Sequence, residues 1–432
     1  MKTEIPELYK IYRNHPNITT DSRKVEPGSL FFALKGENFD GNRFASDALK
    51  KGAAFAIVDD TPPEPNNRFI VVDNVLNTLQ ELAVYHRKRL LIPVIGITGS
   101  NGKTTTKELI SAVLGRKYRT FATSGNLNNH IGVPVSVLSI SNSHELAIIE
   151  MGANHQGEIA ALSRIALPDF GLITNIGKAH LEGFGGYEGV INAKTELYQF
   201  ISETHGKLFV NGDDPLLMEK SKGLRSILYG SNDQATVAGE ITQKFPFITA
   251  RILIHNDEIL VKTQMVGAYN LDNILAAACI GNHFSVSPQQ IQEAIGNYSP
   301  QNHRSQWYET KSNKIVMDAY NANPTSMKLA LENFAESPFT NKMLILGDMR
   351  ELGPVSKSEH GEICDLIRKL GFQDVILVGP EFKKVEAGKK QFTLFNGVEE
   401  AKDVLRKNPP SGKTILIKGS RGKKKKKLLE DL

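Results

Sequence analysis

The residues best suited to chemistry lie in the stretch VIGITGSNGKTTT, at positions 94–106. A β-branched apolar run leads there into a turn of small residues, and a helical pattern follows. In such a unit, Gly99 and Gly102 let backbone N–H groups point at phosphate oxygens, with the positive end of the helix dipole behind them. Lys103 adds a point charge, and Thr104 offers a hydroxyl to Mg²⁺. The stretch therefore predicts a phosphate-binding loop.

This loop departs from the full nucleotide-binding pattern at one position. That pattern has a glycine five residues before Gly102, where the sequence has Ile97. The shorter TGxxGKT form is typical of one subgroup of nucleotide-binding proteins. The alternative is a glycine-rich turn that binds no ligand, and the Lys103–Thr104 pair makes this alternative the weaker one.

Further polar residues follow apolar runs elsewhere in the chain. Glu150 ends the run ELAIIE, His180 lies in a glycine-rich loop, and Asp213 follows the strand candidate 208–211. Doubly wound sheets bind ligands beyond the carboxyl ends of their strands. A buried carboxylate also needs a cation or hydrogen bonds. Taken alone, a single histidine such as His180 is more often structural than a ligand.

The elements that would position these residues indicate an α/β protein of three domains. Residues 1–90 read as a small N-terminal α/β substrate domain with polar loops. Residues 91–298 alternate strands (92–98, 146–151, 170–175 and 208–211) with helices, which predicts a central, mainly parallel sheet covered on both faces. After a linker at Ser299-Pro300, residues 299–432 predict a Rossmann-like doubly wound domain.

Composition places the chain among globular proteins. It has 432 residues, 40% of them hydrophobic and 23% charged, which argues against disordered and fibrous classes. No run is long enough to span a membrane, and the N-terminus lacks the apolar core of a secretory signal. Cys279 and Cys364 lie in apolar helical patterns, which predicts buried free thiols in a reducing compartment. Together these features predict a cytoplasmic protein.

The net charge of +5 does not indicate a nucleic-acid-binding protein. Lys423–Lys427 supply five positive charges, so the rest of the chain is neutral. A terminal lysine run is usually a solvated helix face or a tail, and binding of phosphate or an acidic partner is the alternative.

Nine stretches, spread in order over all three expected domains, together resemble the Mur ligase family of peptidoglycan synthesis. They are GITGSNGKTTTKE (96–108), GNLNNHIGVP (125–134), IEMGANHQGEI (149–159), NIGKAHLEGFG (175–185), AKTELY (193–198), YNLDNILAA (269–277), DAYNANPTSM (318–327), LGDMRELG (346–353) and IKGSRG (417–422). EMGANH and AYNANPTSM resemble the branch of the family that adds D-alanyl-D-alanine. The DNPR-type motif of the branch that adds the third peptide residue is not visible.

The resemblance implies ATP-dependent ligation of D-alanyl-D-alanine to UDP-N-acetylmuramoyl-tripeptide, through phosphorylation of the peptide carboxylate. It implies catalytic roles for Lys103, Glu150, His180 and Lys194. One Mg²⁺ would sit with Thr104 and Glu150, and a second with His180 and a carbamylated Lys194. Nucleotide contacts would come from Gly99, Ser100, Asn101, Gly102, Lys103, Thr104, Thr105, Asn273, Arg304 and Asp318.

The resemblance also implies substrate contacts. The UDP-sugar would meet Asp21, Ser22, Arg23, Asn126, Asn128 and Asn129. D-alanyl-D-alanine would meet Asp348, Glu351, Lys418 and Arg421, for which ordinary loop and capping roles are the alternative. From spacing alone Lys194 reads as a solvated helix lysine, and only the resemblance reverses this interpretation. We expect a monomer without nucleic-acid partners.

Other functions remain open from the sequence. A sister ligase, such as the third-residue-adding enzyme or a folylpolyglutamate synthetase, is the nearest alternative. A P-loop ATPase switch or kinase is the alternative from another class, although neither needs three domains with separate polar clusters.

Overall fold

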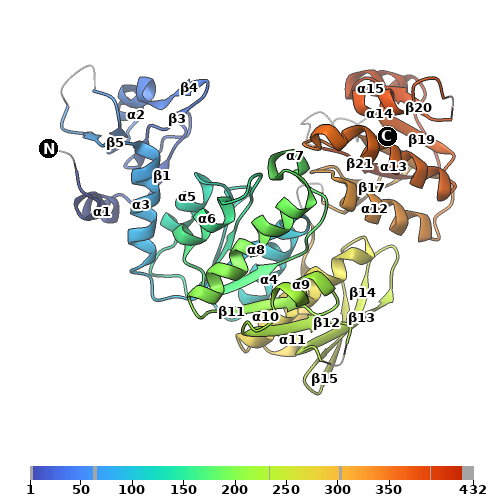
Figure 1. Cartoon of the computed structure of the whole chain (residues 1–432), viewed down its shortest axis with the longest axis horizontal. Coiled ribbons are helices and arrows are strands. Elements are labelled where there is room, and N and C mark those ends of the chain that lie inside the picture. Colours follow the sequence, from blue (N-terminus) through green and yellow to red (C-terminus); the bar gives the residue numbers. More distant parts are fainter. Residues whose placement is uncertain (1–2, 62–65, 233, 301–303, 390, 421–432) are drawn as a thin grey trace.

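Three main sheets follow one another along the chain in this computed structural model, which describes residues 3–61, 66–232, 234–300, 304–389 and 391–420. The sheets have four, nine and six strands, and a two-stranded β3-β4 pair accompanies the first. We call the parts built around them the N-terminal unit (α1 to α3), the central unit (β7 to α11) and the C-terminal unit (β16 to β21). Figure 1 shows them from blue through green to orange. The predicted α/β class is confirmed, whereas the domain boundaries after residues 90 and 298 stay predictions.

The N-terminal unit is a small parallel sheet of order β1-β2-β5-β6 flanked by helices. Its elements are α1 (Ile5–Asn14), β1 (Ile18–Thr19), β2 (Leu30–Phe32), β3 (Lys35–Gly36), β4 (Phe39–Asp40), η1 (Gly41–Phe44), α2 (Ala45–Lys50), β5 (Phe55–Val58), β6 (Phe69–Val71) and α3 (Val75–Arg87). Asn74 caps α3 by accepting a hydrogen bond from the backbone N–H of Asn77.

Helix α3 joins the N-terminal unit to the central unit by packing on α5 and α6. His86 Nε2 donates to the Ile140 carbonyl at 2.8 Å, and its Nδ1 lies 3.2 Å from the Tyr9 hydroxyl. Arg87 donates to the last carbonyls of α6, Ala166 at 3.0 Å and Leu167 at 2.9 Å. These buried bonds fix the two units against each other.

The central unit is a nine-stranded sheet of order β15-β14-β13-β12-β11-β10-β7-β9-β8. Its elements are β7 (Val94–Thr98), α4 (Lys103–Leu114), β8 (Thr120–Ala122), α5 (Gly132–Leu138), β9 (Leu146–Glu150), α6 (Glu158–Ala166), β10 (Phe170–Ile173), α7 (Leu181–Phe184), α8 (Tyr187–Glu203), β11 (Lys207–Asn211), α9 (Pro215–Lys220), β12 (Ser226–Gly230), β13 (Val237–Gln243), β14 (Thr249–Ile254), β15 (Asp257–Lys262), η2 (Ala268–Asn270), α10 (Leu271–His283) and α11 (Pro288–Asn297).

Both faces of this sheet are covered, which explains why its strands read as continuous apolar runs. Every residue of β7 is buried: Val94 belongs to the core under α5, α6 and α8, and Ile95 and Ile97 belong to the core under α4, α10 and α11. Strand β7 lies between β9 and β10 and is parallel to both. Their carboxyl ends therefore meet at one edge of the sheet, where a doubly wound sheet binds its ligands.

The C-terminal unit is a six-stranded sheet of order β16-β17-β21-β18-β19-β20. Its elements are β16 (Gln306–Glu309), β17 (Lys314–Asp318), α12 (Pro324–Glu336), β18 (Lys342–Gly347), η3 (Gly353–Val355), α13 (Ser356–Lys369), β19 (Asp374–Val378), α14 (Pro380–Val385), β20 (Thr393–Phe395), α15 (Val398–Lys407) and β21 (Thr414–Lys418). Asn323 caps α12 ahead of Pro324, a residue suited to the first turn of a helix.

Two further predictions can be compared with this structure. Cys279 in α10 and Cys364 in α13 are free and buried, as expected. Within the described ranges, no helix combines the length and the apolar character needed to cross a membrane.

Candidate active site

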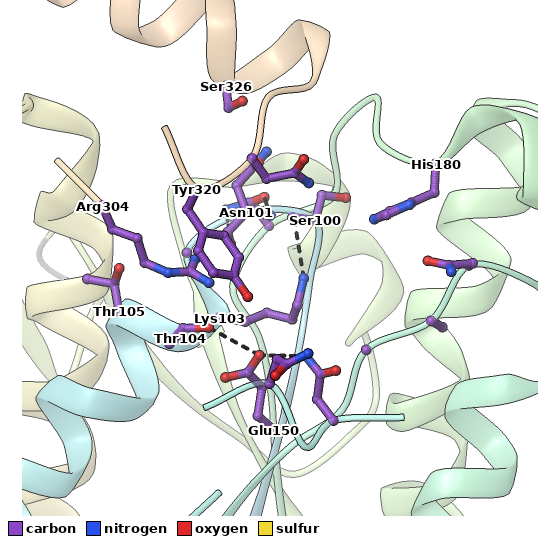
Figure 2. Close-up of a pocket in the computed structure, with 18 of the residues that line it drawn as sticks. Ser100, Asn101, Lys103, Thr104, Thr105, Glu150, His180, Arg304, Tyr320 and Ser326 are labelled. Carbon is purple, nitrogen blue, oxygen red and sulfur yellow. Dashed lines mark hydrogen bonds between the residues drawn. The ribbon is translucent and has the colours of Figure 1, made fainter. Parts of the chain in front are cut away.

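A cavity of about 930 Å³ lies at the carboxyl ends of the central strands, and all three units contribute to its wall. Figure 2 shows Ser100, Asn101 and Lys103 in the middle, Arg304 and Tyr320 on one side and His180 on the other. The structure brings together most residues that were expected to form the site. Those that line the cavity are Ser100, Asn101, Gly102, Lys103, Thr104, Thr105, Asn126, Asn128, Asn129, Glu150, His180, Asn273, Arg304, Asp318, Glu351 and Lys418.

The phosphate loop requires glycine at two positions. Gly99 has φ 144° and Gly102 has φ 81°, conformations that side-chain-bearing residues rarely adopt. A Cβ on Gly99 would lie 2.0 Å from Thr174 Oγ1, and one on Gly102 would lie 2.6 Å from Asn273 Oδ1. The loop is thus folded tightly against β10 and α10, with helix α4 beginning at Lys103 directly behind it.

Lys103 curls back over this loop. Its Nζ donates to the Gly99 carbonyl at 2.6 Å and to the Ser100 carbonyl at 3.3 Å. Burial lowers the pKa of Lys103 to about 8, an effect that the nearby Glu150 opposes and Arg304 reinforces. The amine of Lys103 is therefore mostly protonated at neutral pH. Its hydrogen bonds go to neutral carbonyls, so it can exchange them for a charged hydrogen bond to a phosphate oxygen.

Glu150 at the end of β9 is a buried carboxylate, with 1% of its surface exposed. Its Oε1 accepts hydrogen bonds from Thr104 Oγ1 at 3.2 Å and Asn128 Nδ2 at 2.8 Å. Its Oε2 faces Lys107 Nζ at 3.4 Å and accepts no hydrogen bond from the described residues. A buried carboxylate oxygen beside a threonine hydroxyl fits Mg²⁺, which prefers hard oxygen ligands.

His180 and Glu351 meet across the cavity from opposite units. His180 precedes α7 in a left-handed conformation (φ 51°), and Glu351 has φ 61° in the loop after β18. The two side chains form an ion pair through His180 Nδ1, and the hydrogen bond from His180 lowers the pKa of Glu351. Both side chains are thus directed into the space where a metal and substrates are expected.

Lys194 is buried in α8 and does not line the cavity. Only 2% of its surface is exposed, and its Nζ lies 5.1 Å from the centre of the Phe184 ring. Burial, aided by the positive charge of Lys103, lowers the pKa of Lys194 to about 7. The interpretation as a solvated helix lysine is therefore wrong. A large neutral fraction at neutral pH is what carbamylation requires, so the residue fits that modification.

Polar residues expected around the nucleotide lie beside the phosphate loop. Asn273 accepts from Thr106 Oγ1 at 2.8 Å and donates to Asn270 Oδ1 at 2.8 Å. The guanidinium of Arg304 lies 3.5 Å from the centre of the Tyr320 ring. The Nε of Arg304 has no hydrogen-bond partner among the described residues, and burial lowers the pKa of this guanidinium.

Residues expected to meet the UDP-sugar fall into two groups. Asn126, Asn128 and Asn129 line the cavity, whereas Asp21, Ser22 and Arg23 lie in the N-terminal unit outside its lining. Asp21 accepts hydrogen bonds from the backbone and guanidinium of Arg23, which holds the pKa of its carboxyl well below the usual range. The structure therefore does not bring these two groups together in one pocket.

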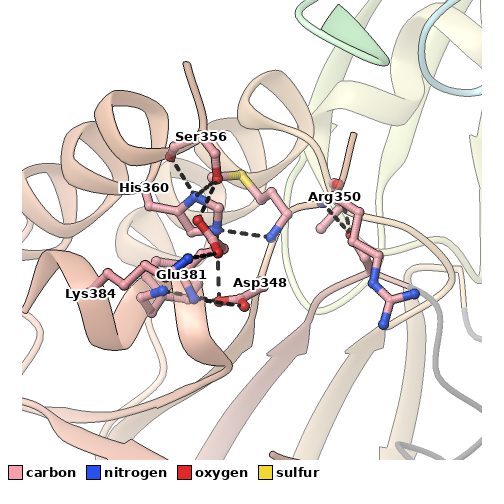
Figure 3. Close-up of polar contacts among 10 residues, drawn as sticks. Asp348, Arg350, Ser356, His360, Glu381 and Lys384 are labelled. Carbon is pink, nitrogen blue, oxygen red and sulfur yellow. Dashed lines mark hydrogen bonds and ion pairs between the residues drawn. The ribbon is translucent and has the colours of Figure 1, made fainter. Parts of the chain in front are cut away.

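Residues expected to hold the dipeptide are also divided. Glu351 lines the cavity, and so does Lys418, which forms an ion pair with Asp318. Asp348 lies outside the lining and accepts from the first backbone N–H groups of α14, Glu381 at 3.0 Å and Phe382 at 3.1 Å (Figure 3). Asp348 thus has the capping role that was the alternative. Arg421 and Lys423–Lys427 lie outside the described residues.

Several residues in or beside the cavity were not found from the sequence. Lys107 does not line the cavity but reaches Glu150 beneath it from one helical turn beyond Lys103, a spacing that was visible in GKTTTK. Tyr320 lies within DAYNANP, and Arg164 and Arg350 line the cavity from α6 and from the loop after β18. Arg350 lies inside the quoted stretch LGDMRELG without having been singled out, whereas Arg164 lies in none of the quoted stretches.

Comparison with known proteins gives matches along nearly the whole chain. Family models match in sequence order: the "Mur ligase family, catalytic domain" over residues 16–95, the "Mur ligase middle domain" over 97–281 and the "Mur ligase, glutamate ligase domain" over 303–421. The UDP-N-acetylmuramoyl-tripeptide–D-alanyl-D-alanine ligase of Bacillus subtilis (strain 168) is 36% identical over 429 residues, covering 96% of this chain and 92% of the relative. This chain belongs to the Mur ligase family.

Solved structures agree with the assignment to the Mur ligase family. MurF from Acinetobacter baumannii has a TM-score of 0.86 at 32% identity, covering 96% of this chain and 93% of that one. MurF ligase from Thermotoga maritima, in complex with ADP, has a TM-score of 0.84 at 28% identity, covering 96% of each chain. A folylpolyglutamate synthase from Mycobacterium tuberculosis, at 13% identity and a TM-score of 0.61, shares the fold alone.

Proposed function

We propose that this Mur ligase joins D-alanyl-D-alanine to UDP-N-acetylmuramoyl-tripeptide at the expense of ATP, giving the pentapeptide, ADP and phosphate. The observation that carries the proposal is the single cavity in which the phosphate loop meets residues of the C-terminal unit. A nucleotide on Lys103 would face a peptide and an incoming amine there. The relatives that match this chain over most of its length carry the name of that reaction.

The chemistry follows from the poor reactivity of a carboxylate toward amines. An oxygen of the tripeptide's terminal carboxylate attacks the γ-phosphorus of ATP, and ADP leaves, which gives an acyl phosphate. The free amine of D-alanyl-D-alanine then attacks the carbonyl carbon and loses a proton. The tetrahedral intermediate collapses with loss of phosphate, and the amide bond remains. Negative charge accumulates on phosphoryl oxygens, so fixed cations supply most of the stabilisation.

Residues of this chain are assigned to that stabilisation. Lys103 and the N–H groups of the phosphate loop hold the β- and γ-phosphates, and Arg304 adds a cation from the start of the C-terminal unit. Thr104 and Glu150 would hold one Mg²⁺, and His180 with a carbamylated Lys194 would hold a second. When bound, magnesium supplies Lewis-acid stabilisation of the phosphoryl oxygens.

Substrate positions follow the three-unit architecture. We assign residues 1–90 to binding of the UDP-sugar, 91–298 to ATP, and 299–432 to the ligation partner. Asn126, Asn128 and Asn129 support a sugar position between two units, because they line the cavity that Gln80 of the N-terminal unit also lines. We further propose that the enzyme acts as a monomer in the cytoplasm, where ATP is available.

A coupled assay for ADP release tests the function. Purified protein with ATP and magnesium should release ADP only when both UDP-N-acetylmuramoyl-tripeptide and D-alanyl-D-alanine are present. ADP release with only one of the two substrates would indicate a kinase or ATPase. ADP release with a UDP-N-acetylmuramoyl-dipeptide and a free amino acid would indicate a sister ligase. The matched variant is Lys103→Ala, which should lower turnover at least about a hundredfold, with its melting temperature measured to show that it is folded.

A further inference from the structure

A cross-unit contact near the cavity is not used by the proposed chemistry. The loop between β10 and α7 reaches the C-terminal unit at Lys178, whose Nζ lies 2.7 Å from Glu359 Oε1 and 3.7 Å from Glu362 Oε2. The backbone N–H of Lys178 also donates to Thr325 Oγ1, at the start of α12, at 2.9 Å. One residue of the central unit thus contacts both α12 and α13.

Glu359 is an unusual residue for the face of α13 that it occupies. The side chain of Glu359 is 8% exposed, whereas that of Glu362, about one turn further along α13, is 66% exposed. Among the residues described, no cation other than Lys178 lies within ion-pair distance of Glu359. A buried carboxylate without a partner is costly, so this one favours the arrangement in which Lys178 reaches it.

The surrounding contacts place this ion pair next to residues that line the cavity, although neither Lys178 nor Glu359 lines it. A Cβ on Gly177 would lie 2.8 Å from Thr325 Oγ1, so the loop lies very close to α12. Asn101 of the phosphate loop accepts from Asn323 Nδ2 at 2.8 Å, and both Asn101 and Thr325 line the cavity. A rotation of the C-terminal unit that carries α13 away from this loop separates Lys178 from Glu359.

We propose that Lys178 is a positioning residue, which holds the C-terminal unit over the cavity by pairing with Glu359. The inference rests on the proposed ligation, because it assigns the ion pair to the approach of the incoming dipeptide. A nucleotide held by the phosphate loop contacts mainly the central unit. The dipeptide approaches against the C-terminal unit, whose orientation this pair sets. Weakening the pair lowers the population of the productive arrangement and affects the dipeptide step most.

A second cross-unit pair provides a matched control. Lys244 Nζ lies 2.8 Å from Glu336 Oε2, but the two side chains are 50% and 59% exposed. Exposed pairs of this kind contribute little to association, because water screens both charges. Lys244→Gln also removes one positive charge at the boundary between the central and C-terminal units, but it leaves no buried carboxylate without a partner, because Glu336 is exposed.

The test compares steady-state kinetics of Lys178→Gln, Glu359→Gln and the double variant. We expect each single variant to raise the KM for D-alanyl-D-alanine about three- to tenfold, because a partly buried charged hydrogen bond is lost. The double variant should be no worse than the more impaired single one, since both remove the same interaction. ADP affinity should change less than about twofold, and Lys244→Gln should resemble the wild type.

Three outcomes would overturn the proposal: either single variant retaining the wild-type KM for the dipeptide, the two effects multiplying in the double variant, or ADP affinity falling in parallel. The last would mean general loss of structure. An effect confined to Lys178→Gln is a case of the first outcome and would point to local disturbance of the His180 loop. Solution scattering of the ligand-free protein gives an independent readout, because both single variants should increase the radius of gyration. If the wild type does not ligate the two substrates but both variants show the larger radius of gyration, the proposed function is wrong while the role of the ion pair in holding the units together is supported.

Discussion

Lys194 is the residue whose surroundings differ most from those its sequence position suggests. It lies in the middle of a long helix, where a lysine normally extends its ammonium into water. The structure buries it beside Phe184 and brings its pKa to about 7, with burial as the main cause. A neutral amine can combine with CO₂ to form a carbamate, and the oxygens of a carbamate are hard anionic ligands.

We expect Lys194→Ala to lose most ligation activity while ADP still binds to the phosphate loop. The reason is that Lys103, which we assign to the phosphates, makes its hydrogen bonds to Gly99 and Ser100 independently of Lys194. Turnover and ADP affinity, measured side by side, check this expectation. Carbon-13 NMR of wild-type protein equilibrated with labelled bicarbonate should show a carbamate resonance that the variant lacks. A wild-type spectrum without that resonance, from enzyme with full activity, would contradict the assignment.

At this scale the sequence predicted residue types and their neighbours better than their burial. The spacing of Gly99, Gly102 and Lys103 indicated the tight turn before α4 correctly, because such a turn is built from local backbone geometry, whereas its binding of phosphate stays a prediction. The burial of Lys194 depends on α8 packing against the sheet, which no local pattern encodes. For the same reason, the capping role of Asp348 could only be offered as an alternative.

Among the elements, α14 depends on a side chain from a distant loop. Asp348 accepts its first backbone N–H groups, and a Cβ on Gly379 would lie 2.2 Å from the Asp348 carboxylate. We expect Asp348→Ala to lower the free energy of unfolding by about 1 kcal/mol, as loss of a helix cap does, with the KM for the dipeptide nearly unchanged. Chemical denaturation and steady-state kinetics measure the two quantities. The control Asp365→Ala, at a side chain 79% exposed on α13, should have a smaller effect.

The opposite result would restore the role implied by the family resemblance. If Asp348→Ala raised the KM for D-alanyl-D-alanine about tenfold or more without loss of stability, the carboxylate would be a dipeptide contact.

Helix α3 should make stability depend on pH through His86. Its two ring nitrogens are occupied by Tyr9 and the Ile140 carbonyl, and burial lowers its pKa below the usual 6.5. Below that value the unfolded chain binds a proton that the folded protein does not, so the free energy of unfolding falls as the solution is acidified. At higher pH both states are neutral and the effect is absent.

Urea denaturation of the wild type and of His86→Gln, between about pH 7 and pH 5, measures this dependence. The wild type should lose stability more steeply with acid than the variant. His155→Gln, at a histidine side chain 67% exposed, should keep the wild-type slope. Equal slopes for wild type and His86→Gln would show that His86 does not contribute.

The central sheet shows where prediction of elements succeeded and failed. Strands β7, β9, β10 and β11 were found within a few residues because burial on both faces makes their sequences continuously apolar. No strand was predicted between residues 212 and 298, yet β12 to β15 lie there. In β14 every second residue is buried, since one face of this antiparallel extension meets solvent. An alternating pattern is harder to distinguish from a loop than a continuous one.

For the whole molecule, the distribution of site residues implies motion. Arg304 precedes the first strand of the C-terminal sheet and Asp318 ends its second strand. Both residues nevertheless line the cavity together with the phosphate loop of the central unit. Substrates must enter a space that these residues help to enclose, so we expect the C-terminal unit to close about the Ser299-Pro300 linker. Small-angle scattering should show a smaller radius of gyration with an ATP analogue and the UDP-tripeptide together than with neither. An unchanged radius with both bound would contradict closure.

The place of β21 in its sheet has a consequence for how the enzyme is made. This strand lies between β17 and β18, although Thr414–Lys418 come after every other strand described in the chain. During translation, β17 and β18 leave the ribosome long before their common neighbour, so the sheet remains divided until β21 has also emerged. Lys418, the partner of Asp318 at the cavity, arrives with that strand. A product interrupted before residue 414 therefore keeps the loop of Lys103 but lacks both the strand that joins β17 to β18 and the partner of Asp318.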